Sequence, residues 1–213
     1  MIELKHIRKK YKENILFEDV SAVFSSPVIK IAGENGIGKS VLLKMIVGYS
    51  FPDSGQVICD GSVLGENGRD FIEDAGIFID APQFMSQWSG YDNLAYLADI
   101  RKRCSAEKLK ELIEYFDLTD DIHKKYRTYS LGMRQKMRLI QAVMDDPKYL
   151  ILDEPFDSLD QTAVTKTMAL LKDHVSAGAG RMMIYTSHSE TDTSFTDEIY
   201  TIDHHKLVAL PLH

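Results

Sequence analysis

The sequence has few of the features that mark disulfide-rich, zinc-binding or membrane-spanning proteins. Only two cysteines, Cys59 and Cys104, occur in 213 residues, and neither has a cysteine or histidine at a ligand-like spacing. Neither a disulfide framework nor a structural zinc site is therefore indicated, and a reducing compartment fits. Residues 1–6 carry charge where a secretory signal needs an apolar run, and no apolar run reaches membrane-spanning length. We expect a chain that does not itself cross a bilayer.

Basic residues are fewer than acidic residues in this sequence. There are 25 lysines and arginines against 32 aspartates and glutamates, which gives a formal net charge of -7. This is the wrong sign for a surface that neutralises phosphates, although the local basic run Arg8-Lys9-Lys10 remains, so we expect no nucleic-acid partner. With 44% hydrophobic residues, a chain of this length can bury one substantial core with a small attached lobe. One globular unit is the expectation.

Hydrophobic periodicity predicts strands that alternate with helices. Alternating apolar and polar residues, or short apolar runs beside glycine, predict strands at 2–7, 17–24, 28–32, 57–59, 76–79, 149–152, 182–185, 199–202 and 206–210. Apolar residues at helical spacing predict helices within 39–47, 89–116, 133–144 and 162–175. The segment 89–116 is read as part of an inserted helical lobe, and Ser89 to Asp92 resembles a capping box at its start. Strands that alternate with helices imply an α/β fold with a largely parallel sheet.

A phosphate-binding loop follows the predicted strand 28–32. The run Gly33-Glu34-Asn35-Gly36-Ile37-Gly38-Lys39-Ser40 matches the P-loop pattern, and a predicted helix starts within it. Its glycines let successive backbone N–H groups face one anion, and the helix N-terminus adds partial positive charge. Lys39 would reach the outer phosphates and Ser40 would hold Mg²⁺. A glycine-rich turn without a ligand is the alternative, which the flanking strand and helix disfavour.

Two acids end another predicted buried strand, as a P-loop enzyme requires. The apolar run 149–152 leads directly into Asp153 and Glu154. Asp153 would bind Mg²⁺, directly or through water, and Glu154 could polarise the water that attacks the terminal phosphate. An apolar run that ends in two acids is more often simply a strand leaving the core. Its weight therefore comes from the P-loop upstream.

Further motifs, in a fixed order, identify a family. The run Tyr129-Ser130-Leu131-Gly132-Met133-Arg134-Gln135 precedes a predicted helix, and Pro155-Phe156-Asp157-Ser158-Leu159-Asp160 follows the two acids. With an aromatic at Tyr11 and a histidine in Tyr185-Thr186-Ser187-His188, this set resembles the ATP-binding subunit of ABC transporters over nearly the whole chain. The resemblance implies a P-loop NTPase (RecA-like) core with a mostly parallel sheet, an antiparallel β subdomain and an inserted α-helical subdomain. It also implies an Mg²⁺-dependent ATPase.

The resemblance assigns roles to five residues outside the P-loop and the strand acids. Tyr11 matches the aromatic that stacks on adenine; alone, it would be a packing residue at a strand end. Ser130 and Gly132 match signature positions that contact the terminal phosphate held by the opposite subunit, although Ser130 alone would be a helix cap. Asp160 matches the loop that communicates across the dimer, and an N-cap role is compatible with this. His188 matches the histidine that hydrogen-bonds the terminal phosphate.

The sequence departs from the family pattern at three places. Leu131 and Met133 replace the usual glycine and glutamine of the signature, while the phosphate-contacting positions are kept. Asp80 stands where most relatives place a glutamine that touches Mg²⁺ and the coupling loop; Gln83, displaced by three residues, is the rival for that role. The third departure, Phe156-Asp157 after the strand acids, suggests no mechanistic consequence.

The expected site residues fall into three groups. The resemblance implies catalytic roles for Glu154, His188 and Lys39. It implies nucleotide contacts from Tyr11, Gly33, Glu34, Asn35, Gly36, Ile37, Gly38, Lys39, Ser40, Val41, Ser130, Gly132 and Asp160. The Mg²⁺ ligands implied are Ser40, Asp153 and Asp80.

The same resemblance implies how the chain is divided into subdomains and which partners it has. We expect one ABC ATPase domain over 1–213, with a helical subdomain at about 84–146, an antiparallel β subdomain at about 1–26 and 55–63, and the catalytic core in the remainder. The implied partners are a second ATPase subunit, brought together by ATP and either identical or not, and integral membrane permease subunits. The implied location is the cytoplasmic face of the cell membrane.

The residues at positions 80 and 130–133 bear on the direction of transport. An acid at position 80 together with Ser130-Leu131-Gly132-Met133 is similar to the branch that exports bacitracin, lantibiotics and related compounds, although the carboxyl-terminal extension usual in that branch is absent from this sequence. Export is therefore favoured. The alternatives are a permease-free ABC ATPase in assembly, translation or DNA repair, and a nucleotide-gated interaction module. The acidic charge disfavours the first, and the presence of both Glu154 and His188 disfavours the second.

Overall fold

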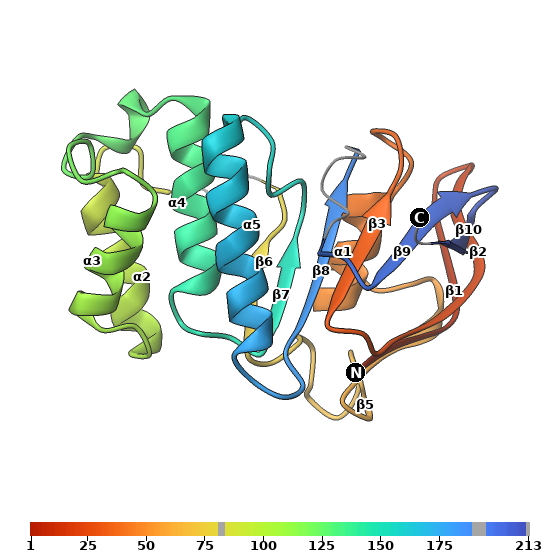
Figure 1. The fold of residues 1–213 in the computed structure, drawn as a ribbon. Helices are drawn as coiled ribbons and strands as arrows, with labels where there is room; N and C mark the ends of the chain where they lie inside the picture. The colour runs from red at the N-terminus through yellow and green to blue at the C-terminus, as the bar shows by residue number, and fades with distance from the viewer. Residues whose placement is uncertain (81–83, 189–194, 212–213) are drawn as a thin grey trace.

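The computed structural model describes residues 1–80, 84–188 and 195–211 (Figure 1). The strands are β1 (Ile2–Tyr11), β2 (Asn14–Phe24), β3 (Val28–Ala32), β4 (Ser54–Cys59), β5 (Ser62–Val63), β6 (Ala75–Phe78), β7 (Tyr149–Leu152), β8 (Met182–Ser187), β9 (Glu198–Asp203) and β10 (Lys206–Leu210). The helices are α1 (Lys39–Val47), α2 (Gly90–Arg101), α3 (Ala106–Tyr115), α4 (Leu131–Val143) and α5 (Gln161–Ser176), with a short 3-10 helix at Tyr126–Thr128.

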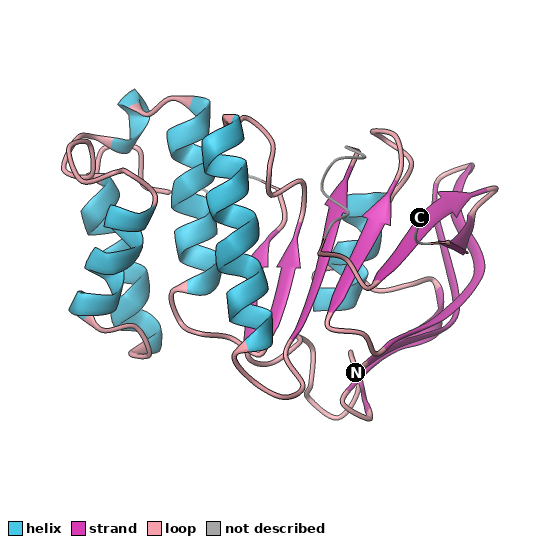
Figure 2. Ribbon diagram, viewed as in Figure 1, coloured by secondary structure: helices cyan, strands magenta, loops and turns pink. Residues whose placement is uncertain are grey.

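The strands form two sheets. The larger sheet has the order β10-β9-β3-β8-β7-β6, and all its pairings are parallel except that of β10 with β9. The smaller sheet, β2-β1-β4-β5, is antiparallel throughout. The fold is thus the α/β arrangement expected from the sequence, a mostly parallel core sheet beside an antiparallel one (Figure 2).

Alternation along the central strands divides the core into two hydrophobic clusters. In β7, Tyr149 and Ile151 belong to the cluster that contains α1 and the antiparallel sheet. Leu150 and Leu152 belong to the cluster built with α2 to α5. Because successive side chains of a strand point to opposite faces, each apolar strand is covered on both sides. This explains why the buried strands read as continuous apolar runs.

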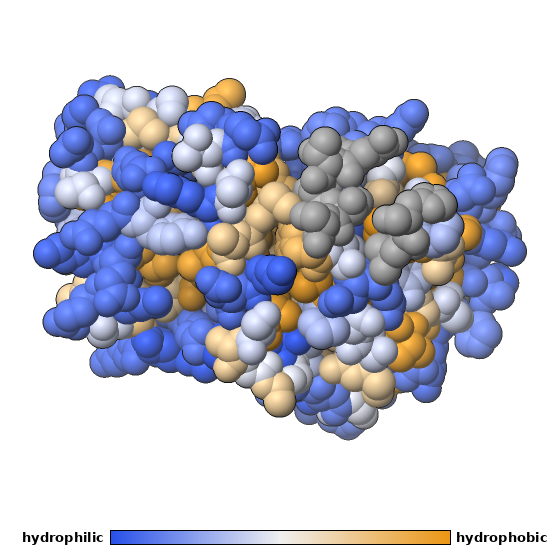
Figure 3. Space-filling model, in the orientation of Figure 1, coloured by the Kyte–Doolittle hydropathy of each residue, from blue (hydrophilic) through white to orange (hydrophobic). Residues whose placement is uncertain are grey.

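The predicted helical segment 89–116 contains two helices, α2 and α3. Lys102 adopts a left-handed backbone with φ of 54° and ends α2, and Ser105 caps α3 by accepting a hydrogen bond from Lys108 N at 3.1 Å. At the start of α2, Ser89 is the N-cap that the sequence predicts: its Oγ accepts a hydrogen bond from Asp92 N and donates one to Asp92 Oδ2 in place of the reciprocal backbone bond of a full capping box. These helices form the outer part of the helical side, where Figure 3 shows mostly hydrophilic side chains on the face in view.

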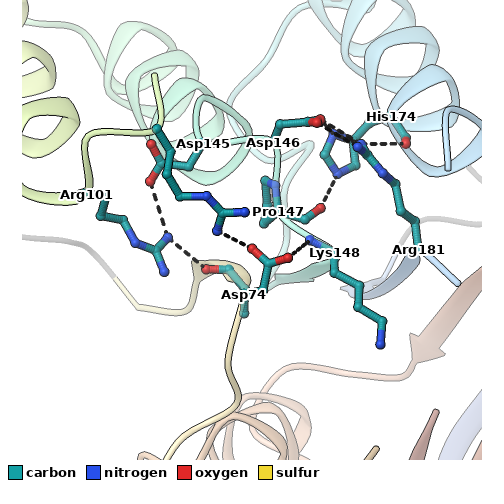
Figure 4. A network of polar contacts seen from close by, with 10 residues as sticks. Asp74, Arg101, Asp145, Asp146, Pro147, Lys148, His174 and Arg181 are labelled. Atoms are coloured by element: carbon teal, nitrogen blue, oxygen red, sulfur yellow. Dashed lines mark hydrogen bonds and ion pairs between the residues drawn. The ribbon is translucent and has the colours of Figure 1, made fainter. Parts of the chain in front are cut away.

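A polar network joins the helical side to the amino ends of β6 and β7 (Figure 4). Arg101, at the end of α2, pairs with Asp145 after α4, and Arg103 pairs with Asp74 before β6. Asp74 also accepts a hydrogen bond from Lys148 N at 3.2 Å. The network therefore connects three chain segments, the end of α2, the residue before β6 and the loop between α4 and β7, at the edge of the sheet where its parallel strands begin.

Several strands are longer than the sequence pattern predicts. β1 and β2 run to a tight turn at Lys12 and Glu13, and β5 is a two-residue strand that periodicity does not predict. The strand 28–32 and the helix 39–47 have their predicted bounds. Among the described residues, none of the helices combines the length and apolar character needed to cross a membrane.

Candidate functional site

Three parallel strands bring the predicted motifs to one edge of the sheet. β3, β8 and β7 are neighbours in that order, and each is followed directly by a motif. The P-loop follows β3, His188 follows β8, and Asp153 and Glu154 follow β7. Because the carboxyl ends of parallel strands lie at the same edge, the motifs meet there, where ligands of open α/β sheets bind.

The P-loop forms the floor of a cavity at this edge. The cavity has a volume of about 190 Å³, and its lining comes from the P-loop, the start of α1, β2 and the β7 acids. The lining residues are Leu16, Asn35, Gly36, Gly38, Lys39, Ser40, Val41, Asp153 and Glu154. Of the predicted P-loop contacts, Gly33, Glu34 and Ile37 lie in the same loop but outside this lining set.

The loop enters α1 with a free helix N-terminus. Gly38 is the N-cap with φ of 116°, a left-handed conformation that suits glycine, and no described side chain caps the helix there. A Cβ atom at Gly38 would lie 3.2 Å from Phe17 Cζ, which adds a steric reason for glycine. Since the first N–H groups of a helix lack intrahelical partners, this terminus is suited to an anion.

Lys39 is buried and points back across the loop. Its Nζ donates to the carbonyl oxygens of Gly33 at 2.6 Å and Glu34 at 3.2 Å. The same Nζ lies 3.0 Å from Glu154 Oε1, a close ion pair that lacks the alignment of a hydrogen bond. Lys39 therefore links the phosphate loop to the acid predicted to activate water.

Asp153 and Ser40 fit a magnesium site. Thr186 Oγ1 donates to Asp153 Oδ1 at 2.6 Å and so orients the carboxylate. Ser40, at the start of α1, lines the same cavity as Asp153. A hydroxyl and a carboxylate from two elements, beside a phosphate loop, are the hard oxygen donors that Mg²⁺ prefers. Thr186 itself is a residue that sequence reasoning did not single out, because a threonine at a strand end carries no distinctive signal.

Glu154 lies between two predicted partners. Its Oε1 faces Lys39, and its Oε2 lies 3.2 Å from His188 Nδ1, which donates when it carries the proton. Its backbone has φ of 49°, and its N–H donates to Thr186 Oγ1 at 2.9 Å. A left-handed conformation at a non-glycine residue is costly and is held here by surrounding contacts. The predicted grouping of Lys39, Glu154 and His188 is present.

Asp157 belongs to the same cluster, which the sequence reading missed. Its Oδ1 lies 4.0 Å from His188 Nδ1. One carboxylate oxygen of Glu154, one of Asp157 and a ring nitrogen of His188 all lie within 4.8 Å of one another. Partial burial raises the pKa of the Asp157 carboxyl, and the negative charge of Glu154 raises it further. The signal available was a third acid three residues after Glu154.

Ser130 of the signature and Asp160 of the dimer loop act as helix N-caps. Ser130 Oγ accepts from Met133 N at 3.2 Å at the start of α4, and Asp160 Oδ1 accepts from Ala163 N at 2.8 Å at the start of α5. The helix-cap role that the sequence alone indicates for Ser130 and for Asp160 is therefore present in both cases. Gly132 follows Ser130 in α4, where a Cβ atom would come within 2.9 Å of Ser158 O. Ser130, Gly132 and Asp160 lie outside the lining set of the P-loop cavity, so their nucleotide contacts stay a prediction.

The remaining predicted residues are placed apart from the cavity lining. Tyr11 ends β1 with half of its surface exposed, and Lys9 Nζ lies 5.3 Å from its ring centroid. The carboxylate of Asp80 pairs with Lys44 Nζ at 2.7 Å, one helical turn beyond Ser40 in α1. Adenine stacking by Tyr11 and a magnesium role for Asp80 stay predictions. Gln83, the rival to Asp80, lies outside the described residues.

Comparison with known proteins gives the family. The family described as "ABC transporter" matches residues 19–157, well over half of the chain. The chain belongs to this family. It is 34% identical over 189 residues to an uncharacterized ABC transporter ATP-binding protein, YhcH, of Bacillus subtilis, with 88% of this chain and 62% of that protein covered. It is 31% identical over 189 residues to the bacitracin transport ATP-binding protein BcrA of Enterococcus faecalis, with 88% and 61% covered.

Solved structures of ABC cassettes share the fold. A dimeric post-hydrolysis structure of the ATP-binding cassette MJ0796, bound to ADP and Pi, aligns with a TM-score of 0.84 over the full length of both chains at 20% identity. At that identity the likeness establishes the fold alone. The present 213-residue chain spans about three fifths of the length of its relatives YhcH and BcrA.

Proposed function

We propose that this ABC cassette binds ATP with Mg²⁺ and hydrolyses it. The observation that carries the proposal is the arrangement at the carboxyl edge of the sheet, where Lys39, Glu154 and His188 converge beside the P-loop. The free N-terminus of α1 and the backbone of the loop would hold the phosphates. Ser40 and Asp153 would hold Mg²⁺, which neutralises phosphate charge when bound.

Glu154 is the proposed general base. A phosphate that engages Lys39 competes with the Glu154 carboxylate for the same ammonium, and the carboxylate is then available to accept a proton from water. His188 holds the second carboxylate oxygen and would donate its hydrogen bond to the terminal phosphate in turn. The backbone N–H of Glu154 donates to Thr186 Oγ1, which holds the main chain from which the carboxylate extends.

Hydrolysis is proposed to require a second ATPase subunit. Ser130 and Gly132 lie at the N-terminus of α4, away from the cavity lining of their own chain. A partner's terminal phosphate would meet the N–H groups and hydroxyl there, so that each nucleotide lies between the P-loop of one subunit and the signature of the other. ATP would thus hold two subunits together, and phosphate loss would release them.

A membrane permease is the proposed partner on which this cycle acts. Two exposed aromatic pairs, Tyr49 with Phe71 and Trp88 with Tyr96, flank Asp80 in the sequence. Exposed aromatic side chains are typical of protein contact surfaces. The proposed docking region is where the core meets the helical side, at the cytoplasmic face of the membrane.

Export is the proposed direction, of an antimicrobial peptide, an antibiotic or a similar compound. The support is Asp80, the signature run Ser130-Leu131-Gly132-Met133 and the relation to BcrA. Affinity purification of the tagged chain from membranes should recover a multi-span membrane protein. Recovery of ribosomes or DNA in its place would favour an ATPase without a permease.

The experiment that tests the function is Glu154→Gln. This variant should bind Mg-ATP and accumulate as a dimer in light scattering, while hydrolysis falls at least about 100-fold because a general base is lost. Lys39→Ala is the matched control, and it should lose binding of a fluorescent ATP analogue and stay monomeric. Unchanged hydrolysis by Glu154→Gln would remove the assigned role from Glu154.

A further inference from the structure

The helix that carries the signature residues reaches the catalytic loop of its own chain through Gln135. This side chain, in the second turn of α4, is only 4% exposed, and its Nε2 donates to the main-chain oxygen of Glu154 at 2.9 Å. Arg138 donates to its Oε1 at 3.3 Å, which fixes which end of the amide faces Glu154. A buried amide with both ends bonded is held in one orientation.

The main chain of Glu154 is held from both sides. Its N–H donates to Thr186 Oγ1, and its oxygen accepts from Gln135. Because φ at Glu154 is 49°, the peptide units beside it would relax toward commoner geometry without these contacts. Relaxation by a fraction of an ångström would move the carboxylate away from Lys39 and His188. Gln135 is therefore placed to determine where the general base points.

The same helix packs on the residues that follow Glu154. A Cβ atom at Gly132 would come within 2.9 Å of Ser158 O, so the first turn of α4 lies directly against the loop 154–158. Ser158 also has a left-handed backbone, with φ of 61°. The first turns of α4 thus contact the catalytic loop at two points, one of them a hydrogen bond.

We propose that Gln135 is a positioning residue that couples the signature helix to the general base of the same chain. The inference rests on the proposed function, in which the signature of one chain serves the nucleotide on its partner. Closure of α4 on the partner's nucleotide would then be transmitted through Gln135 to Glu154, which serves the chain's own nucleotide. One side chain would link the two sites of the dimer.

The test is Gln135→Met, which keeps the length of the side chain and removes the donor. We expect kcat for ATP to fall about tenfold, equivalent to about 1.4 kcal/mol, with KM and binding of a fluorescent ATP analogue within about twofold of the parent. Gln141→Met is the matched control, because Gln141 lies on the same helix and its Oε1 has no hydrogen-bond partner within the described residues. It should leave kcat unchanged.

A double-mutant cycle separates positioning from a merely structural role. If Gln135 acts through Glu154, then Gln135→Met should add no further loss to Glu154→Gln in single-turnover hydrolysis. Should Gln135→Met fold poorly, Gln135→Glu is the second variant, and it should lose as much activity because an ionised carboxylate cannot donate to the carbonyl.

Two results would overturn the inference. One is a parent-like kcat for Gln135→Met; the other is a loss that adds fully to that of Glu154→Gln. If Glu154→Gln itself hydrolyses ATP normally, the proposed function fails first. If Glu154→Gln behaves as expected and Gln135→Met does not, only the coupling through Gln135 is wrong.

Discussion

At the scale of single residues, Asp157 occupies an electrostatically unfavourable position for a carboxylate. It lies close to Glu154, and partial burial together with that neighbouring charge raises the pKa of its carboxyl. An acid whose pKa is raised in the folded state stabilises the fold only at low pH, below its unfolded pKa of about 3.9. This contribution is lost as the pH rises through the folded pKa, so at neutral pH the ionised group destabilises the fold relative to a neutral side chain.

Asp157→Asn should therefore stabilise the protein at neutral pH. Half of the side chain is exposed, so solvent screening keeps the gain below about 1 kcal/mol. We expect Tm at pH 7.5, without added nucleotide, to rise by about 1–2 °C and the difference to narrow toward pH 4.5. Differential scanning fluorimetry across this range measures it. Asp99→Asn, at an exposed site on α2, is the control. A constant difference at all pH values would contradict the electrostatic cause.

The residues of the site differ in how far the sequence could predict them. Lys39, Asp153, Glu154 and His188 stand in motifs whose spacing defines their place at strand ends, and the structure brings them together. Gln135 could not be predicted to touch Glu154, because the contact depends on how α4 packs against β7, which no local pattern encodes.

At the scale of elements, β6 and α4 pack closely at Gly76. A Cβ atom there would lie 1.8 Å from Ala142 O and 2.8 Å from Ala142 C. Backbone atoms cannot move aside as a flexible side chain can. The absence of a side chain at Gly76 thus allows α4 to pack directly against β6.

Gly76→Ala should be strongly destabilising. Overpacking against backbone costs about 3 kcal/mol, which for a chain of this size lowers Tm by about 6–12 °C. Gly61→Ala is the control, because a Cβ atom there meets no described atom within 4 Å and only its φ of 79° opposes alanine. Urea denaturation of both variants gives the comparison. Equal losses in the two would rule out the close packing as the cause.

Elements with strong local signals were predictable to the residue. The helix 39–47 lies between Gly38 and Gly48, and the apolar strand 28–32 lies between Pro27 and Gly33, so local residues define both ends of each. The boundary between α2 and α3 within 89–116 could not be predicted, because it is formed by Lys102 in a left-handed conformation and not by a glycine or proline. The two-residue strand β5 exists only through its pairing with β4, so its own sequence could not indicate it.

At the scale of the whole molecule, the two edges of the parallel sheet have different tasks. The nucleotide cavity lies where β3 and β7 end, whereas the network of Figure 4 lies where β6 and β7 begin. In that network Arg101 NH1 donates to Asp145 Oδ2 and to Ala75 O, both at 3.3 Å. This network thus attaches the helical side to the core at the edge opposite the proposed chemistry, in addition to the contact of Gln135 with Glu154 at the catalytic edge.

Asp145 is buried in this attachment and depends on the positive charge of Arg101. The side chain is 3% exposed, and its Oδ1 has no hydrogen-bond partner within ranges 1–80, 84–188 and 195–211. Removing Arg101 would leave a buried carboxylate without its cation. Breaking one side of such a pair costs more than the pair is worth, because an uncompensated charge stays in the interior.

Arg101→Ala should lower the free energy of unfolding by about 2–3 kcal/mol, somewhat less than for a fully buried pair because Arg101 is itself half-exposed. Lys110→Ala, which removes the exposed Lys110–Glu114 pair on α3, should change it by less than about 0.5 kcal/mol. Adding Asp145→Asn to Arg101→Ala should recover part of the loss, because the unpaired charge is removed. Denaturant unfolding of the four proteins decides the matter: a double variant less stable than Arg101→Ala would show that Asp145 contributes through contacts other than this ion pair.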